Sequence, residues 1–363
     1  MTKKPEPRPG ILDINIYKAG ASTIEGVAKP AKLSSNETPI GPSPKARAAY
    51  EECAADLERY PDSAATDLRQ TIAAEFDLDP ERLVVGAGSD ELLQMIAHAY
   101  VGEGDDVIYT EHSFVVYRLV TKSNGANGIE VEETDYCADV DKILAALTEK
   151  TRVIYLANPN NPTGTYLPAS EIKRLHDGIP SDVLLVMDEA YAEYVERSDY
   201  ESAMDMVHGL DNIVMTRTFS KIFGLAALRL GWAYCPTHVA EVLNRIRGPF
   251  NTTAAAQAAG IEAIKDKDHI AKAKAHNDQW MRWYEQQLGG LGIDFTPSVG
   301  NFILMQFPDR ETATRANQFL LSKGIIVRAA PAPNLGHTLR LSIGMDDENR
   351  HVIDSLSEFL KQE

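Results

Sequence analysis

Short apolar runs alternate with longer amphipathic stretches along the chain up to about residue 236. Runs rich in β-branched residues predict buried strands, and the stretches between them predict helices. Strands are predicted at 82–85, 107–109, 128–131, 152–156, 183–187 and 212–216, and helices from Ser43 towards Glu58, at 66–76, after the turn at 86–91 up to Tyr100, and at 139–147; a further apolar run spans 230–234. This order indicates a mostly parallel, doubly wound α/β sheet, whose sites lie at the carboxyl ends of its strands.

The hydrophobic pattern changes beyond residue 250. Long helical periods at 253–265 and 268–288 precede shorter strand and helix patterns and a terminal helix, which together predict a smaller α+β domain. The first residues carry too little periodic hydrophobicity for a domain and are expected to form an arm that lies on other parts of the protein. We therefore expect an arm at 1–34, a large domain at 35–250 and a small domain at 251–363.

Composition and charge narrow the class of partner. A chain of 363 residues exceeds what one hydrophobic core usually serves, which fits two domains. The net charge of −17 argues against nucleic acid or an anionic membrane surface as partners, because both require clustered positive charge. An anionic substrate would therefore need a few local cations.

Cysteine usage and the terminus point to the cytoplasm. The three cysteines are far apart and form no C-x-x-C pair, which is typical of reduced thiols and argues against a zinc site. The histidines show no metal-binding spacing, so no metal is predicted. The charged, proline-rich N-terminus does not resemble a signal peptide, and no apolar run reaches the ~18–20 residues of a membrane helix.

The segment 216–232 is the strongest candidate for chemistry. Lys221 follows a predicted buried strand, and Thr218 and Ser220 precede it. Poor solvation at such a position favours the neutral amine, which can react with an aldehyde cofactor. Two hydroxyls and the planar guanidinium of Arg229 would suit a phosphate. The alternative is a loop lysine and an arginine paired with a carboxylate.

Two more strand ends carry candidate groups. The turn Gly88-Ser89-Asp90 opens a predicted helix, so it could present backbone N–H groups to an anion, or Ser89 could simply be its N-cap. Asp188 ends the most apolar strand, with Tyr191 three residues later. A buried carboxylate needs a cationic partner, so Asp188 either caps a helix or keeps a ring nitrogen protonated.

Four further positions have both a structural and a functional interpretation. Phe114 could belong to the core or stack on a flat heterocycle, and Tyr60 could simply end a helix. Asn161 lies in a rigid loop of Asn, Pro, Thr and Gly, which would hold its side-chain amide in place. Arg340 alternates with apolar neighbours on a predicted strand, which places it on the polar face.

These motifs, in this order, resemble those of the class I and II aminotransferases, which are fold-type I enzymes dependent on pyridoxal phosphate. The resemblance rests on Asn161-Pro162-x-Gly164, Asp188-x-x-Tyr191, Thr218-x-Ser220-Lys221, Arg229 and Arg340, and spans essentially the whole chain. The motifs at 59–62, 88–91, 249–251 and 327–328 are similar to those of the histidinol-phosphate branch. The pair His112-Ser113 departs from the Pro-Thr that is common in the family.

The resemblance implies roles for residues of this chain. Lys221 would hold the cofactor aldehyde covalently and move the proton, Asp188 would pair with the ring nitrogen, and Tyr191 would bond the ring's 3-oxygen. The residues expected around pyridoxal 5'-phosphate are Tyr60, Gly88, Ser89, Asp90, Phe114, Asn161, Asp188, Tyr191, Thr218, Ser220, Lys221 and Arg229. Tyr60 would reach the cofactor of the neighbouring subunit in a homodimer. Those expected around the substrate are Tyr17, Asn36, Arg328 and Arg340.

The expected activity is amino transfer between histidinol phosphate and 2-oxoglutarate, with three rivals. An aromatic amino-acid aminotransferase would use the same pocket for phenylalanine or tyrosine, and a phosphoamino-acid decarboxylase would share the cofactor and the phosphate-binding arginine. A regulator that only senses the cofactor would require an N-terminal DNA-binding domain, for which the arm and the net charge of −17 leave no room.

Overall fold

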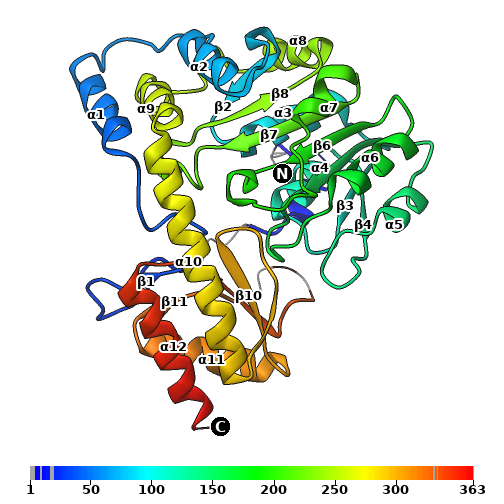
Figure 1. Cartoon of the computed structure of the whole chain (residues 1–363). Helices are drawn as coiled ribbons and strands as arrows, with labels where there is room; N and C mark the ends of the chain where they lie inside the picture. Colours follow the sequence, from blue (N-terminus) through cyan, green and yellow to red (C-terminus); the bar gives the residue numbers. More distant parts are fainter. Residues whose placement is uncertain (1–4, 9, 17–19, 330–331, 333, 363) are drawn as a thin grey trace.

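Seven strands form one twisted sheet in the larger lobe of the protein (Figure 1). The computed structural model describes residues 5–8, 10–16, 20–329, 332 and 334–362. The strand order is β2-β8-β7-β6-β5-β3-β4, and β8 is antiparallel to both of its neighbours while all other pairs are parallel. The strands are β2 (Leu83–Gly86), β3 (Asp106–Thr110), β4 (Asn127–Val131), β5 (Thr151–Ala157), β6 (Leu184–Asp188), β7 (Ile213–Thr218) and β8 (Gly231–Tyr234). The mostly parallel, doubly wound sheet is confirmed.

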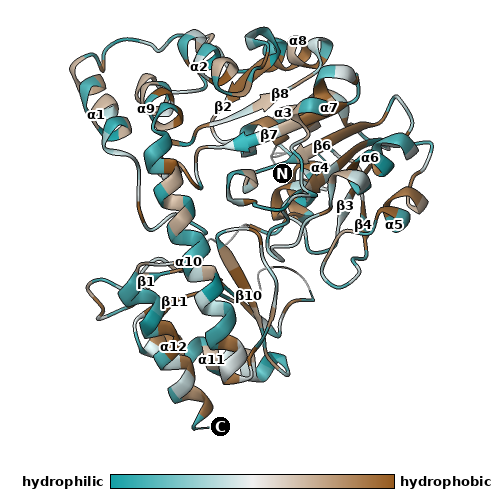
Figure 2. Cartoon of the chain, in the orientation of Figure 1, coloured by the Kyte–Doolittle hydropathy of each residue, from teal (hydrophilic) through white to brown (hydrophobic). Residues whose placement is uncertain are grey.

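Both faces of this sheet are covered because its strands are apolar on both sides. On β5, Ile154 and Leu156 belong to one hydrophobic cluster, whereas Val153 and Tyr155 belong to the other. One face carries α2 (Thr66–Phe76), α5 (Val140–Ala145), α6 (Ala169–Gly178), α7 (Met204–Gly209) and α9 (Ala254–Lys265), and the other carries α3 (Ser89–Tyr100), α4 (Val115–Ser123) and α8 (Thr237–Ile246). Figure 2 shows the apolar strands between helices with hydrophilic outer surfaces.

The smaller lobe is built on an antiparallel sheet in the order β12-β13-β10-β9. Its core includes residues of α10 (Lys267–Leu291), α11 (Arg310–Ser322) and α12 (Asp346–Leu360). Its strands are β9 (Asp294–Thr296), β10 (Phe302–Gln306), β12 (Arg328–Ala329) and β13 (Thr338–Ser342), and a separate parallel pair joins β1 (Ala31–Lys32) to β11 (Ile325–Ile326).

The segment after β1 and the helix α10 both pass between the lobes. Leu33, directly after β1, packs in the core of the smaller lobe, and the chain then crosses to α1 (Pro44–Glu52) of the larger lobe. The helix α10 returns: Ala273 packs in the larger core and Leu288 in the smaller one, and Figure 1 shows this helix running through both lobes. The domain limits 1–34, 35–250 and 251–363 remain predictions.

A local signal in the sequence explains the start of α1, and the structure corrects two other predictions about helix ends. Ser43 accepts a hydrogen bond from the Ala46 amide and caps α1, as expected. That helix ends at Glu52, followed by one 3-10 turn at Cys53–Ala55, and so stops short of Glu58. At α3, Gly88 occupies the N-cap position with a φ of 82°, so the alternative interpretation of Ser89 as the N-cap is wrong.

A close backbone approach fixes the loop that follows β7. Gly224 has a φ of 69°, and its amide donates to the carbonyl of Lys221 at 3.0 Å. A Cβ at position 224 would lie 2.4 Å from the carbonyl carbon of Gly41. Because backbone atoms cannot rotate away, only glycine fits, and the Lys221 loop is held against the segment that precedes α1.

We predict that Gly224→Ala destabilises the protein by about 2–4 kcal/mol, the sum of an unfavourable left-handed conformation and overpacking. The matched control is Gly289→Ala in α10, where a Cβ would meet nothing within 4 Å and where alanine should stabilise by up to ~1 kcal/mol. Urea unfolding at equal protein concentration measures both. Equal stabilities of the two variants would contradict the backbone contact.

Candidate active site

The carboxyl ends of β5, β6 and β7 and the turn after β2 enclose one cavity. Because parallel strands end at the same edge of a sheet, residues distant in sequence meet there. The lining residues are Ser89, Asp90, Phe114, Ala157, Pro159, Asn161, Asp188, Ala190, Tyr191, Thr218, Ser220, Lys221 and Arg229. Ten of these thirteen were expected at the site; Ala157, Pro159 and Ala190 were not.

Asp188 is a buried acid with one hydrogen bond. It ends β6, is 4% exposed, and its Oδ2 accepts a hydrogen bond of 2.8 Å from the Tyr117 hydroxyl. Its Oδ1 is buried and has no hydrogen-bond partner among the described residues. Burial raises the pKa of Asp188 from 3.8 to about 6, against the opposing effect of the Tyr117 hydrogen bond. A bound group with an N–H donor could therefore form a hydrogen bond to Asp188 Oδ1.

The neighbouring acid, Glu189, has several hydrogen-bond and ion-pair partners within the protein. Glu189 is 1% exposed and lies 3.1 Å from the Arg217 guanidinium. It also accepts hydrogen bonds of 2.6 Å from the Ser202 hydroxyl and the Ala203 amide. A buried charge normally requires such partners, and Asp188 Oδ1 has none among the described residues, which favours the interpretation of Asp188 as a group that binds a ligand.

Lys221 is held within the cavity by the segment that joins the lobes. Its Nζ donates to the carbonyl of Ser35 at 3.2 Å and lies 5.4 Å from the ring centroid of Tyr191. The Tyr191 hydroxyl in turn accepts a hydrogen bond of 2.8 Å from Asn36 Nδ2. Asn36 is 1% exposed and also bonds Ser342 of the smaller lobe. The amine and the tyrosine are therefore positioned by both lobes.

The opposite end of the cavity has the donors that a phosphate requires. Arg229 Nη1 donates to the Ser220 hydroxyl at 3.0 Å, and Thr218 Oγ1 lies 3.0 Å from the same hydroxyl. The first N–H groups of α3, at Ser89 and Asp90, have no intrahelical acceptor. A Cβ at Gly88 would lie 2.3 Å from Arg229 Nη2, so the glycine allows the guanidinium to approach the turn.

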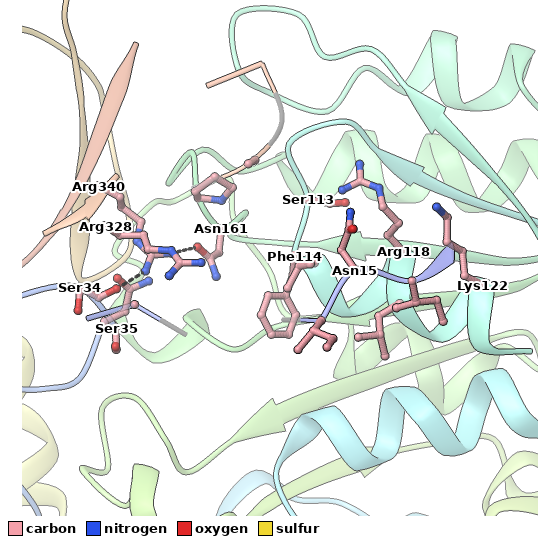
Figure 3. A pocket seen from close by; sticks show the side chains of 18 of the residues that line it. Asn15, Ser34, Ser35, Ser113, Phe114, Arg118, Lys122, Asn161, Arg328 and Arg340 are labelled. Carbon is pink, nitrogen blue, oxygen red and sulfur yellow. Dashed lines mark hydrogen bonds between the residues drawn. The ribbon is translucent and has the colours of Figure 1, made fainter. Parts of the chain in front are cut away.

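A second cavity of about 590 Å³ opens from the first and shares Phe114, Asn161 and Lys221 with it. Figure 3 shows Arg328 and Arg340 near Ser34, Ser35 and Asn161 on one side of Phe114, and Arg118 and Lys122 of α4 on the other. The arm contributes Asp13 to Ile16 and Gly20 to the lining. Arginines on the side of Lys221 make this cavity suited to an anionic substrate.

Arg340 is buried, so a solvent-facing arginine, the alternative interpretation of this strand, is wrong. Every residue of β13 is buried, and Arg340 is 8% exposed. Its Nη2 donates to the carbonyl of Ser34 at 2.8 Å, and its Nη1 donates to Asn161 Oδ1. The polar side of the strand faces the cavity between the lobes.

Tyr117 is a site residue that the sequence did not reveal. It lies on α4 three residues after Phe114, with the two rings edge to face at 6.0 Å, and is fully buried. Its position on the apolar face of a helix predicts only a core residue. The available signal is its hydroxyl, because a buried tyrosine usually needs a hydrogen-bond partner.

Among the described residues, two of the predicted site residues, Gly88 and Tyr60, do not line these cavities, although Gly88 directly precedes Ser89 in the turn. Tyr60 is 81% exposed, stacks on Phe250 with ring centroids 4.5 Å apart, and lines neither cavity. Tyr17 lies outside the described residues. Within the part of the chain that is described, there is no group of three metal-ligating side chains, and no helix is long and apolar enough to cross a membrane.

Comparison with known families agrees with this geometry. Residues 28–356 match the model of the family "Aminotransferase class I and II". The chain belongs to this family. The match covers the arm from before β1, the strand ends that line both cavities, and most of α12.

Curated relatives place this aminotransferase among proteins named histidinol-phosphate aminotransferase. It is 51% identical over 358 residues to that of Paramagnetospirillum magneticum, covering 98% of this chain and 99% of the relative. It is 49% identical over 362 residues to that of Rhodopseudomonas palustris, covering 99% of each chain.

Solved structures share the fold. The histidinol-phosphate aminotransferase of Sinorhizobium meliloti, in complex with pyridoxal-5'-phosphate, superposes with a TM-score of 0.91 at 25% identity over 99% of both chains. The aspartate aminotransferase of Thermus thermophilus with maleate has a TM-score of 0.79 at 21% identity over 91% of both chains. The fold-type I aminotransferase architecture expected from the sequence is confirmed.

The raised pKa of Asp188 makes the stability of the cofactor-free protein dependent on pH. The folded state binds this proton more tightly than the unfolded state, so the contribution of Asp188 to stability is present below pH 3.8 and is lost as pH rises through about 6. The Asp188→Asn variant has no carboxyl to ionise at this position, so it does not lose this stability as the pH rises. Its stability relative to wild type should therefore increase by about 1–1.5 kcal/mol between pH 5 and pH 8.

Chemical unfolding of the cofactor-free proteins at the two pH values measures this difference. Asp205→Asn, which alters an exposed acid on α7, is the control and should keep the pH dependence of wild type. A constant difference between Asp188→Asn and wild type across this range would contradict the shifted pKa.

Proposed function

We propose that this aminotransferase uses pyridoxal 5'-phosphate to transfer the amino group of L-histidinol phosphate to 2-oxoglutarate, giving imidazole acetol phosphate and glutamate in histidine biosynthesis. The observation that carries the proposal is that Lys221 lines both cavities: the first contains the buried carboxyl of Asp188, and the second is lined by Arg328 and Arg340. The printed names of the relatives support the same substrate.

The residues present fit the cofactor. Asp188 Oδ1 would accept from the protonated ring nitrogen, and Asn161 and Tyr191 would bond the ring's 3-oxygen. The phosphate would be held by the first amides of α3 with Thr218, Ser220 and Arg229. When bound, the cofactor supplies an electron sink that stabilises negative charge at the substrate α-carbon.

The protein's own groups would do the remaining work. Lys221 Nζ would hold the cofactor covalently before substrate enters and would then move the proton at the substrate α-carbon. Phe114 would cover one face of the ring, which also keeps water from it. Arg340 would hold a carboxylate of glutamate or 2-oxoglutarate, and Arg328 would face the distal phosphate of the other substrate. Local cations are needed because the chain carries a net charge of −17.

The completed site would require two copies of the chain. Tyr60 and Phe250 form an exposed aromatic pair, and such pairs are typical of surfaces that a partner covers. We propose a homodimer in which Tyr60 reaches the cofactor phosphate of the neighbouring subunit. We further propose that the enzyme acts in the cytoplasm, in keeping with its unpaired cysteines.

The role of Arg328 can be tested by substrate choice. Losing a charged hydrogen-bond donor should lower kcat/KM for histidinol phosphate by about 10- to 100-fold in Arg328→Ala, and for phenylalanine by less than about threefold. The control is Arg118→Ala, which removes an arginine from the far side of the same cavity, where it pairs with Glu130. Both assays use 2-oxoglutarate as acceptor.

Equal losses for the two amino donors would contradict the role of Arg328. Turnover of phenylalanine at the rate of histidinol phosphate in wild type would indicate an aromatic amino-acid aminotransferase. Release of carbon dioxide from a phosphoamino acid without glutamate formation would indicate a decarboxylase.

The shared site can be tested by mixing variants. Lys221→Ala and Tyr60→Ala should each be nearly inactive alone. In a hybrid dimer, the Tyr60→Ala subunit keeps Lys221 and receives an intact Tyr60 from its partner. Random mixing should therefore recover roughly a quarter of wild-type activity, since about half of the dimers are hybrids with one complete site.

Recovery is measured after mixing under conditions that allow subunit exchange, followed by return to assay buffer. The unmixed variants are the controls. If Tyr60 served its own subunit, every chain would lack one essential residue, and the mixture would remain as inactive as its components.

A further inference from the structure

We propose that Tyr117 is a positioning residue that fixes Asp188 and Phe114 relative to each other, so that the acid at the edge of the cofactor ring and the phenyl group on its face keep one fixed arrangement. This inference rests on the proposed cofactor. Tyr117 lines neither cavity, so it would act only through these two neighbours.

The placement of Tyr117 leaves its ring little freedom. It is fully buried on α4 and stacks on Tyr155 of β5, with ring centroids 5.0 Å apart and planes 6° from parallel. Its edge meets Phe114 at 6.0 Å and 88°. A ring packed between a strand residue and Phe114 cannot change its rotamer without moving one of them, so the hydroxyl position is set by the core.

The hydroxyl of Tyr117 is directed to a side chain, unlike that of its stacking partner. Tyr117 donates to Asp188 Oδ2 at 2.8 Å, whereas Tyr155 donates to the backbone carbonyl of Leu93 at 3.1 Å. Tyr155 therefore satisfies its own buried hydroxyl without contacting the site. Tyr117 gives Asp188 a hydrogen bond that leaves Oδ1 as the oxygen for the bound ring.

The same hydrogen bond also influences the charge of Asp188. It favours the carboxylate and lowers the pKa, while burial, Asp90 and Glu189 raise it. The titratable and charged groups around this carboxyl are Tyr117 of α4, Asp90 of α3, its neighbour Glu189, Tyr155 behind Tyr117, and Tyr191 and Lys221 across the cavity. Because Tyr117 is itself buried and its pKa lies well above 10, it remains a donor across the working range of pH.

Tyr117→Phe and Tyr155→Phe form a matched pair of variants. Each removes one buried hydroxyl from the same stack, so the cost to packing and stability should be similar. Only Tyr117→Phe removes the hydroxyl that donates a hydrogen bond to Asp188. The measurement is the affinity of cofactor-free protein for pyridoxal 5'-phosphate, followed by visible absorbance and circular dichroism from pH 5.5 to pH 8.5, with no substrate present.

We expect Tyr117→Phe to bind the cofactor about tenfold more weakly near pH 7, the value of one hydrogen bond to a charged group. The pH below which affinity falls should move upward by about one unit, since the carboxyl then protonates more readily. The dichroism of the bound cofactor should also change, because the ring and Phe114 lose their fixed angle. Tyr155→Phe should match wild type in cofactor affinity, in the pH dependence of that affinity and in the dichroism of the bound cofactor.

A second variant tests the same point in the opposite direction. Placing 3-fluorotyrosine at position 117 keeps the ring and makes its hydroxyl a stronger donor, so the acidic fall in affinity should move to lower pH. Because this variant keeps both the ring and the buried hydroxyl with its hydrogen bond to Asp188, it would still report if Tyr117→Phe failed to fold.

The outcomes separate the two proposals. If wild-type protein does not bind pyridoxal 5'-phosphate, the proposed function fails. If wild type binds it, but Tyr117→Phe and Tyr155→Phe have equal affinities and pH profiles, the role of Tyr117 is wrong while the proposed function stands. Loss of stability in both variants with a change in cofactor binding in only one supports the positioning role.

Discussion

The site depends on the cost of burying a carboxylate. Asp188 ends a strand buried on both faces, where desolvation raises its pKa to about 6 against the opposing hydrogen bonds from Tyr117 and the Ala190 backbone. The adjacent Glu189 has a guanidinium, a hydroxyl and an amide. Glu189 is thus satisfied by protein groups, whereas Asp188 keeps one oxygen that a ligand could bond. A protonated ring nitrogen would relieve this cost, so cofactor binding and the stability of the larger lobe are linked.

Both lobes are needed to place the arginine side chains near Lys221. The larger lobe holds the amine on the loop after β7, and the smaller lobe brings Arg328 and Arg340 from its edge and central strands. Neither lobe alone encloses the chamber. Since α10 packs in both cores, the lobes are joined by a continuous helix as well as by the segment after β1. The width of the chamber therefore depends on how these connections hold the two lobes.

The sequence was sufficient for those features that depend on local patterns. Apolar runs predicted the strands β2 to β7 of the large sheet, and polar residues beside such runs singled out Asp188, Lys221 and Arg229, which line one cavity, because strand ends and turn residues leave a local signal. It was insufficient where the partner is distant in the chain. The burial of Arg340 depends on Ser34 and Asn161, and the function of Tyr117 depends on an acid 71 residues away. The N-cap at Gly88 was misplaced by one residue because a glycine lacks the capping side chain that such predictions use.

The segment after β1 has a consequence for the evolution of substrate size. Consecutive carbonyls at Ser34 and Ser35 hold Arg340 of one lobe and Lys221 of the other. Two successive peptide units therefore set the distance between the Lys221 amine and the Arg340 guanidinium, since neighbouring α-carbons are about 3.8 Å apart. Substitutions at either serine would leave this distance intact, since the carbonyls belong to the main chain. A deletion or insertion there would change the separation of the Lys221 amine and the Arg340 guanidinium, and with it the length of molecule that both could contact.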